Sequence, residues 1–399
     1  MQAFEGIKVL DFTHVLAGPF CAYQLAVMGA DVIKIEDPSD PDMMRAEGRS
    51  PALAADGRGT EFVCQAGNKR GLTVDLKTEA GVAIVHKLAE TADVVVSNFR
   101  NGVMDRLGIG ADVLQAINPK LIYCAMSGFG GTGPKARHPA YDNVIQAYSG
   151  LMNATGSPNS GPFRVGPAVL DYGTGAQAAF AIAAALFQRT RTGKGQRIDV
   201  AMLDAALMLM TNHVANTHAA GAALPRSGNW NLTKAAYGDF ETADGTLMVG
   251  AFTHRQLANL WRAVGRDDMA DAMAGQTMEE VDSHKESDRT LFREIFLTKP
   301  ASEWEDILND NGVPGARVRD LHEAMTSTQV ASRQVLQDGV TAPEVGTPIT
   351  NPVAAFAYAE DGAALNREAP RLGEHTDEIL IEIGMPREEI AELRHANVI

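Results

Sequence analysis

The chain has 399 residues, of which 45% are hydrophobic and 21% are charged, and its formal net charge is −15. This composition is typical of a folded globular protein with two or three domains. Because a surface this acidic repels phosphate backbones and anionic lipids, we expect no nucleic-acid partner and no membrane association.

Runs rich in Val and Ile alternate with helical patterns in the first third of the chain. The patterns predict helices at Pro19–Met28, Glu79–Thr91 and Ala111–Ile117, and strands at Ile7–Phe12, Ala30–Glu36, Leu72–Lys77, Asp93–Phe99 and Leu121–Ser127. Continuous apolar strands between helices indicate a parallel sheet that is covered on both faces, and therefore an α/β fold. Ligands of such folds bind at the carboxyl ends of the strands.

The next segments connect this sheet to a region of different composition. Gly150–Val169 is predicted to be a long loop that approaches Leu170–Gly175, where an apolar strand is expected to carry Asp171 into a turn. Ala176–Gln188 is small and apolar on every face, which predicts a fully buried helix. A strand at Arg197–Val200 and a helix at Leu203–Met210 are expected to follow.

A linker near 220–230 separates this part from a more charged, mainly helical region. One strand is predicted in the sequence DGTLMVGA, helices are predicted at Gln256–Val264, Leu291–Leu297 and Ala301–Asn311, and a second linker is expected at Val335–Pro352. We therefore divide the chain into a large domain (1–219), a small α+β domain (220–330), and a linker with a helical C-terminal segment that returns to the large domain (331–399).

Three widely spaced cysteines, Cys21, Cys64 and Cys124, lie in apolar contexts, so we expect buried reduced thiols. The first residues, MQAFEGIKVLDF, are typical of a first strand rather than of a signal peptide. The longest apolar run, Ala178–Phe187, is shorter than the roughly 18 residues of a membrane span. We expect a cytoplasmic protein.

Two glycine-rich sequences resemble phosphate-binding loops but lack their context. Gly128–Gly133 (GFGGTG) follows a predicted strand, but Pro134 does not open an apolar helix and no acidic residue follows at the spacing of a ribose ligand. Thr192–Gln196 (TGKGQ) does not match the ATP-binding pattern. The histidines include no metal-binding pair, so no metal site is predicted.

Asp171 lies in PAVLDYGTG (167–175), at the end of an apolar segment and beside Gly173 and Gly175. Burial disfavours the ionised carboxyl group and makes it a better nucleophile. The glycines would let a bulky ligand approach and expose backbone N–H groups to an oxyanion. Equally, Asp171 could cap a helix that begins near Gly175, and Asp142 could cap a helix predicted at Val144–Tyr148.

Eight segments together resemble one family. They are LDFTHVLAGPF (10–20), GADVIKIE (29–36), NKRGLTVDLK (68–77), DVVVSNFRNGVMDRLGIG (93–110), NPKLIYCAMSGFG (118–130), LDYGTG (170–175), TGKGQRIDVAMLDA (192–205) and LGEHTDEIL (372–380). In this order they look like class III CoA-transferases, which include formyl-CoA and carnitine CoA-transferases and are related to α-methylacyl-CoA racemase. The resemblance extends over the whole chain.

The resemblance implies a large Rossmann-like domain completed by the C-terminal tail, a smaller domain joined by two linkers, and an interlocked homodimer. It places the family's nucleophile on Asp171 and its accompanying acidic residue on Asp142. For the reaction itself, we expect Tyr141 to hydrogen-bond the anhydride or thioester oxygen. Lys77, Arg100, Arg106 and Arg137 would supply positive charge for CoA phosphates. The full set of CoA-binding residues implied is Leu16, Ala17, Val74, Asp75, Leu76, Lys77, Asn98, Phe99, Arg100, Arg106, Arg137 and His138.

The chain departs from the family's pattern at three points. Asp37 replaces an arginine that follows the second strand of formyl-CoA transferase, so adenine packing there must differ. Gly228–Asp239 lacks the glycine-rich loop of the oxalate enzyme, which argues against oxalate as the acceptor. Tyr141 stands where the racemase has the histidine that precedes its aspartate, so one of the two bases for α-proton exchange is missing.

We therefore expect a CoA-transferase that moves CoA from an acyl-CoA such as succinyl-CoA to a small carboxylic acid through an aspartyl-CoA thioester on Asp171. The CoA thioester is a substrate, and no permanently bound cofactor, metal or ATP is expected. The alternative is an acyl-CoA racemase or epimerase in which His138 replaces the missing histidine. A third possibility is a CoA-binding homologue without activity.

Overall fold

The computed structural model describes residues 1–399 and divides them into two compact units. Unit 1 consists of residues 1–152, 164–222 and 328–399, and unit 2 consists of residues 153–163 and 223–327. The changes of unit after 222 and 327 lie within a few residues of the divisions expected from the sequence. Residues 153–163, which the sequence assigned to the large domain, belong to unit 2.

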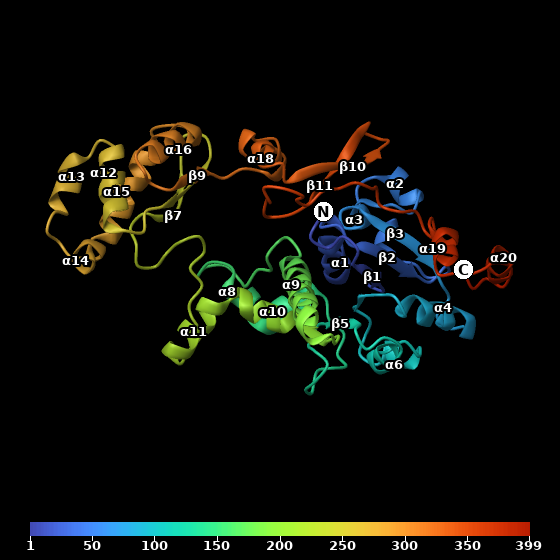
Figure 1. The fold of residues 1–399 in the computed structure, drawn as a ribbon. Coiled ribbons are helices and arrows are strands. Elements are labelled where there is room, and N and C mark those ends of the chain that lie inside the picture. Colours follow the sequence, from blue (N-terminus) through green and yellow to red (C-terminus); the bar gives the residue numbers. More distant parts are fainter. The chain divides into compact units, whose positions relative to one another are not determined.

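Six parallel strands form the sheet of unit 1 in the order β3-β2-β1-β4-β5-β6 (Figure 1). The chain runs outward from β1 in one direction and then, from β4 on, in the other, which is a doubly wound, Rossmann-like arrangement. The expected α/β class is confirmed. The strands are β1 (Lys8–Asp11), β2 (Asp31–Glu36), β3 (Lys69–Thr73), β4 (Val94–Ser97), β5 (Ile122–Ser127) and β6 (Arg197–Ala201).

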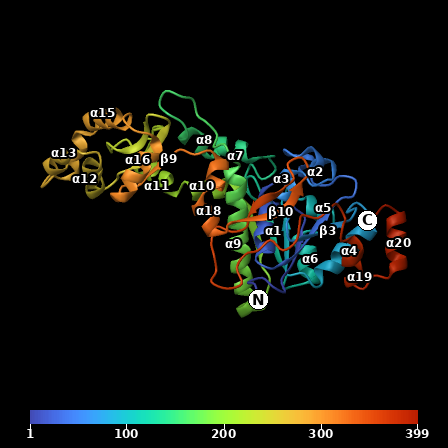
Figure 2. The ribbon, with the colours of Figure 1, turned by 90° about the horizontal axis from the view of Figure 1, so that it is seen from above.

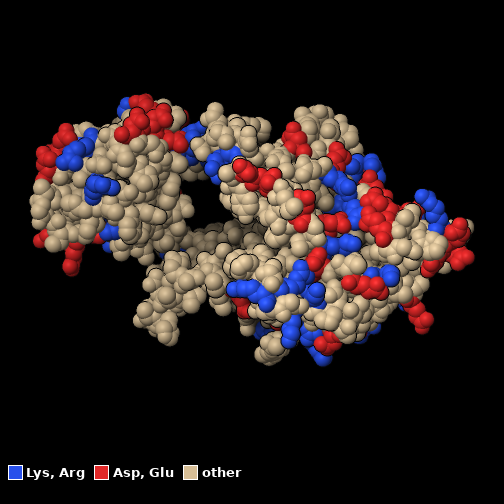
Figure 3. All heavy atoms as spheres, in the orientation of Figure 1, with Lys and Arg blue, Asp and Glu red and all other residues tan.

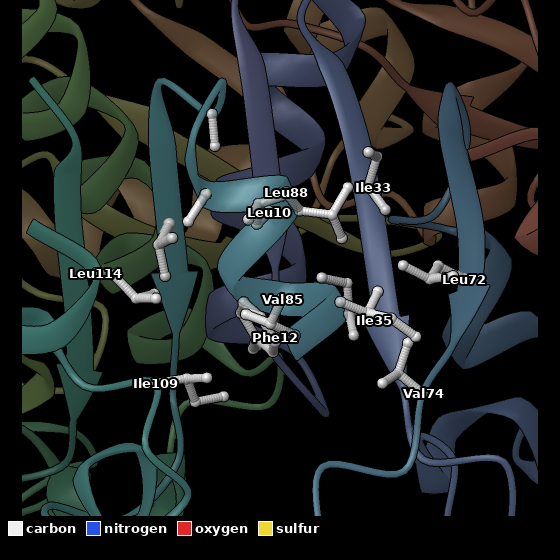
Figure 4. Close-up of a cluster of buried hydrophobic side chains, with 14 of the residues drawn as sticks. Leu10, Phe12, Ile33, Ile35, Leu72, Val74, Val85, Leu88, Ile109 and Leu114 are labelled. Carbon is white, nitrogen blue, oxygen red and sulfur yellow. The ribbon is translucent and has the colours of Figure 1, made fainter. Parts of the chain in front are cut away.

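Apolar side chains cover both faces of this sheet. On one face, Leu10, Ile33 and Leu72 of three adjacent strands pack with Val85 and Leu88 of α4 (Figure 4). The C-terminal helices add buried side chains to the same cluster, and the cluster on the other face is built with α1 and α9 (Figure 2). The covering helices are α4 (Glu79–Ala89), α6 (Ala111–Ile117), α19 (Thr376–Glu382), α20 (Arg387–His395), α1 (Ala17–Val27) and α9 (Val169–Thr192).

The remaining elements of unit 1 lie outside the sheet. They include a hairpin of two antiparallel strands, β10 (Leu336–Ala342) and β11 (Thr347–Pro352), where the sequence suggested a linker. The prolines near this segment are compatible with strands because a two-stranded sheet consists of edges only. The other elements are η1 (Met43–Ala46), α2 (Pro51–Ala55), α3 (Thr60–Val63), α5 (Val103–Arg106), α7 (Asp142–Ser149), α10 (Met202–Leu209), α11 (Thr211–Ala220) and α18 (Thr328–Arg333).

Unit 2 has the expected α+β fold, and its core is rich in aromatic side chains. Trp261 stacks on Phe292 with ring centroids 4.0 Å apart, and Phe240 and Phe296 complete the centre. Its antiparallel sheet contains β7 (Tyr237–Glu241), β8 (Thr246–Gly250) and β9 (Gly315–Arg317). Its helices are α12 (His254–Ala263), α13 (Asp267–Ala272), α14 (Met278–Ser283), α15 (Lys285–Phe296), α16 (Ala301–Asp310) and α17 (Leu321–Met325), and α8 (Leu151–Ala154) spans a boundary between the units.

Helix α9 differs from the prediction in two ways. It begins at Val169, so the segment around Asp171 is its first part and not a strand that ends in a turn. It is also not buried on every face, because Phe180 and Phe187 are 71% and 65% exposed. By length and composition alone this helix could cross a membrane, which is weak evidence because core helices pass the same test. Its buried residues, such as Ile182, pack against the sheet and α1.

Candidate active site

A cleft of about 240 Å³ opens where the strand order of unit 1 reverses, beyond the carboxyl ends of β1, β4 and β5. In open α/β sheets this is the usual place for a ligand. Its lining comes from the loop after β1, the loop after β4, the end of β5, the segment before α7, and helices α9 and α10. All of these residues belong to unit 1.

The structure brings most of the predicted site residues to this cleft. Those that line it are Leu16, Ala17, Asn98, Phe99, Arg100, Arg137, His138, Tyr141 and Asp171. Leu76, Lys77 and Arg106 line a separate hollow of about 380 Å³ instead. Val74 and Asp75 line neither, because β3 ends at Thr73 and Val74 is buried.

Asp171 lies in the first turn of α9, half-buried at the wall of the cleft. Burial, and to a smaller extent the nearby carboxylate of Asp142, raise the pKa of its carboxyl group to about 7. A backbone hydrogen bond from Ala17, the first residue of α1, opposes this rise of the pKa. A carboxyl group with this pKa is an unusually basic carboxylate when ionised, which is typical of a functional site.

Asp142 lies behind Asp171 and does not line the cleft. Its side chain is 7% exposed, and its Oδ2 accepts hydrogen bonds from the backbone N–H groups of Leu170 (2.7 Å) and Asp171 (3.2 Å). Its Oδ1 accepts one from Gln146 Nε2 at 2.6 Å. Asp142 therefore supplies the cap that α9 lacks at Ala168, its own N-cap residue.

Neither Asp171 nor Asp142 caps the helix that the sequence suggested for it. Asp171 does not cap a helix near Gly175, because α9 has already begun two residues before it. Asp142 is the first residue of α7 and caps α9 rather than its own helix. The sequence could not predict this contact, since the two partners are 28 residues apart.

Gly173 and Gly175 permit close helix packing rather than donating to an oxyanion. Both lie inside α9, where their N–H groups bond to carbonyls four residues earlier. A Cβ at Gly175 would lie 2.5 Å from the carbonyl oxygen of Ala17, and a Cβ at Gly173 would lie 2.9 Å from Leu209 Cδ1. The absence of these side chains lets α1 and α10 approach the segment that carries Asp171.

The cations expected to bind phosphates divide into two groups. Arg100, Arg106 and Arg137 form no salt bridge within the chain, so their charge is available to an anionic ligand. Lys77 instead pairs with Asp37 at 2.8 Å. Burial raises the pKa of Asp37, but hydrogen bonds from Lys77 and Ser39 outweigh it and lower the pKa to about 2. Asp37, which replaces the arginine of formyl-CoA transferase, thus neutralises Lys77, which was predicted to bind phosphate.

Among the lining residues that were not singled out from the sequence, His14 and Asn101 make specific contacts. His14 packs on Phe99 with ring centroids 5.2 Å apart. Asn101 donates to the carbonyl oxygens of Gly130 (3.0 Å) and Ala136 (2.6 Å), which closes the glycine-rich loop into a fixed shape beside Arg137. Both residues follow strand ends that had been selected on topology, so that criterion could have found them.

Other reactive groups contribute little to the site. No group of three His, Cys, Asp or Glu residues is placed to hold a metal ion. Cys21 and Cys124 are buried free thiols, as expected, but Cys64 is only partly buried. Burial raises the pKa of Cys64 to about 12, so its thiol is unreactive near neutral pH.

The fold and the cleft define an α/β enzyme with a basic carboxylate beside unpaired arginines, which suits an anionic substrate. Residues 4–376 match the model of CoA-transferase family III, and the chain belongs to that family. The family expected from the sequence is confirmed.

The similarity extends to proteins of known activity and structure. The chain is 35% identical over 387 residues to the succinate–glutarate CoA-transferase of Agrobacterium fabrum, covering 95% of each chain. It is 35% identical to the acetyl-CoA:oxalate CoA-transferase of Acetobacter aceti over 92% of this chain and 95% of that protein. A crystal structure of a CaiB/BaiF family protein from Brucella suis matches with a TM-score of 0.83 and 30% identity over 96% of this chain and 99% of that chain. The protein is therefore a CoA-transferase, and relatives of it act on acyl-CoA and carboxylic acids.

Proposed function

We propose that this enzyme transfers CoA from a succinyl-CoA-like donor to a small dicarboxylic acid through an aspartyl-CoA thioester on Asp171. The observation that carries the proposal is the half-buried Asp171 carboxyl group, whose pKa is about 7 and which faces a cleft with unpaired arginines. A carboxylate of raised basicity is a stronger nucleophile than a solvated one, and partial exclusion of water protects a thioester from hydrolysis.

The reaction proceeds by two pairs of acyl exchanges. The Asp171 carboxylate attacks the donor thioester carbonyl, forms a mixed anhydride and releases the CoA thiolate. The thiolate then attacks the aspartyl carbonyl of that anhydride, which forms aspartyl-CoA and releases the donor acid. The acceptor carboxylate attacks aspartyl-CoA to give a second anhydride and thiolate, and the thiolate attacks the acceptor acyl carbonyl. Acceptor-CoA leaves, Asp171 is a carboxylate again, and one acceptor oxygen remains on it.

Residues of the cleft have distinct parts in this sequence. The backbone N–H of Ala17 donates to the Asp171 carboxyl group and is a candidate for stabilising an oxyanion there. Arg100 and Arg137 neutralise the phosphate charges of CoA. The CoA must stay bound between the release of its thiolate and the next attack by that thiolate. Tyr141 lines the cleft, is 62% exposed and can donate to an acyl oxygen. Asp142 positions Asp171 without touching the substrates.

The relatives support the proposed class of substrates. Their names include succinyl-CoA with glutarate in Mus musculus and succinyl-CoA with mesaconate in Haloarcula hispanica, at 33% and 34% identity. These acceptors are dicarboxylic acids, and the unpaired arginines of the cleft can neutralise a second carboxylate. The chain is 35% identical both to the succinate–glutarate enzyme and to the acetyl-CoA:oxalate enzyme, so identity alone does not select the acceptor. The segment Gly228–Asp239 lacks the glycine-rich loop of the oxalate enzyme, which argues against oxalate.

The experiment is a transfer assay with labelled succinyl-CoA and a panel of four- to six-carbon dicarboxylic acids, run in deuterium oxide. We expect acceptor-CoA to form at the expense of succinyl-CoA, and Asp171→Asn to abolish the reaction. Deuterium at the α-carbon without CoA exchange would instead identify a racemase, with His138 in the same cleft as the second base. Binding of CoA without either reaction would identify a protein that has lost activity.

We further propose a homodimer, with α9, α10 and α11 in the interface. The stretch from Ala205 to Leu224 has no charged residue, and its surface is tan in Figure 3. Exposed apolar side chains gather on these helices: Phe180, Phe187, Leu207, Met208, Leu209 and Val214. Clusters of exposed large apolar side chains are typical of protein–protein interfaces. Light scattering during gel filtration should give twice the chain mass, and Met208→Glu should lower it.

We also propose that the enzyme is located in the cytoplasm. Its three cysteines are free thiols, which fit a reducing compartment.

A further inference from the structure

The loop between β1 and α1 has a conformation that its sequence does not favour. Val15 has a φ of 70°, in the left-handed region. A β-branched residue is strained there, because its Cβ substituents crowd the backbone. Such strain persists only where the surrounding structure imposes it, so the contacts of this loop identify what holds it.

Buried side chains hold both backbone polar groups of Val15. Asp42 Oδ1 accepts a hydrogen bond from the Val15 N–H at 3.2 Å, and Gln65 Nε2 donates to the Val15 carbonyl oxygen at 2.5 Å. Asn98 binds the preceding residue in the same way, since it accepts from the His14 N–H (2.8 Å) and donates to the His14 carbonyl (2.7 Å). The loop is therefore held by side chains from three other segments of unit 1.

Asp42 is anchored in turn by a buried charge. Its side chain is 1% exposed, and its Oδ2 lies 3.2 Å from Lys34 Nζ. Lys34 also donates to the carbonyl oxygen of Thr13, so Lys34 and Asp42 together bind the loop at Thr13 and at Val15. Neither Asp42, Gln65 nor Lys34 lines the cleft. A buried ion pair contributes little to stability on average, so another role is worth testing.

The loop leads directly to Ala17, whose backbone N–H donates to the Asp171 carboxyl group. Leu16 and Ala17 line the cleft, and α1 begins at Ala17 without a side-chain cap. The N–H groups of Ala17 and Gly18 have no partner within the helix, and Pro19 has no N–H group. The backbone of Val15 therefore determines how the Ala17 N–H is directed toward the carboxyl group.

We propose, on the basis of the reaction proposed above for Asp171, that Asp42 and Gln65 are positioning residues. They hold Val15 in the left-handed conformation, so that the N–H of Ala17 at the start of α1 stays directed at the Asp171 carboxyl group while acyl groups are exchanged on it. The strain at Val15 is imposed by the fold to give α1 a direction that a relaxed loop would not give it.

Gln65→Met tests this without removing a charge. Gln65 Oε1 has no hydrogen-bond partner, so the variant removes one unpaired buried atom together with the donor to Val15. Asn351→Leu is the matched control, because Asn351 is equally buried, has an unpaired Oδ1, donates to Val63 and does not line the cleft.

We expect Gln65→Met to lower kcat by about 10- to 100-fold, the cost of misplacing reacting groups, while KM for succinyl-CoA stays within about threefold. Asn351→Leu should leave kcat unchanged, and both variants should unfold at similar temperatures. Equal kcat in the two variants, or a loss in Gln65→Met that merely follows a fall in unfolding temperature, overturns the proposal.

Val15→Gly supplies the second test. Glycine adopts a φ of 70° without strain, so it needs less support from Asp42 and Gln65. Val15→Gly should restore part of the kcat lost in Gln65→Met or Asp42→Ala, and additive losses contradict the positioning role. A wild-type enzyme that forms no thioester on Asp171 would overturn the proposed function instead, so the two failures are distinguishable.

Discussion

The backbone N–H of Asp171 donates to Oδ2 of Asp142 over 3.2 Å, while the charge of that same carboxylate helps to raise the pKa of the Asp171 side chain. Asp142 thus fixes the position of Asp171 through its backbone and its basicity through space. Because Asp142 also accepts the N–H of Leu170 at 2.7 Å, it secures the first turn of α9 as a unit.

The pKa of Asp171 predicts how activity depends on pH. Burial, followed by the charge of Asp142, places this pKa at about 7, well above the ordinary value of 3.8. Only the ionised carboxylate attacks a thioester, so kcat/KM should fall by about tenfold per pH unit below pH 7 and level off above it. A profile of kcat/KM between pH 5 and about 9 measures this, and a flat profile down to about pH 5 contradicts it.

Asp142→Asn should move this acidic limb toward lower pH. Loss of the neighbouring charge makes the Asp171 carboxylate easier to form, and therefore less basic. Gln146→Met is the matched control, since it removes the 2.6 Å hydrogen bond to Asp142 but keeps the charge. The limb should shift in Asp142→Asn alone. An equal shift in both variants would assign the effect to displaced structure instead.

Gly175→Ala should damage both stability and catalysis. The new methyl group would meet the Ala17 carbonyl oxygen at 2.5 Å and push α1 away from α9. We expect a loss of about 2 kcal/mol in the free energy of unfolding, measured with urea, and a fall in kcat of about 10-fold or more.

Gly173→Ala is the control for the helix itself, because its methyl group would meet the movable end of Leu209 at 2.9 Å. Alanine is the better helix former at both positions. If Gly173→Ala and Gly175→Ala lose equal amounts of activity, close packing of α1 is not what the glycine at 175 provides.

Arg137→Ala should weaken acyl-CoA binding. Arg137 lines the cleft and has no acidic partner, so its charge is free for an anion. We expect KM for succinyl-CoA to rise by about tenfold, with a weaker dependence of KM on salt than in the wild type. Arg197→Ala, which removes an exposed arginine paired with Asp112, should leave KM unchanged. Unchanged KM in Arg137→Ala would remove this arginine from the CoA site.

Most of the fold could be predicted because buried parallel strands are encoded by short apolar runs in the sequence. The strands from β1 to β6 were expected close to their observed ends, apart from β3, where Leu72–Lys77 was expected and Lys69–Thr73 is observed. Lys69 and Arg70 are charged but buried, and their partners Asp11 and Asp31 lie far away in the chain. A pattern of polarity cannot reveal such pairs.

The candidate site was less predictable in its details. The glycines of α9 disfavour a helix locally, and only the approach of α1 and α10 explains them. Asp142 was found by resemblance, but its capping of α9 depends on a tertiary contact. The left-handed Val15 is opposite to the preference of its residue type, so no sequence rule would place it.

The central claim is that a thioester forms on one side chain. Incubating the enzyme with succinyl-CoA and then with hydroxylamine should convert that thioester to a hydroxamate, and mass spectrometry of the peptides should place the added mass on Asp171 and nowhere else. Asp171→Asn should carry no added mass. Normal turnover with an unmodified Asp171 peptide, or a label on another residue that persists in Asp171→Asn, would contradict the account.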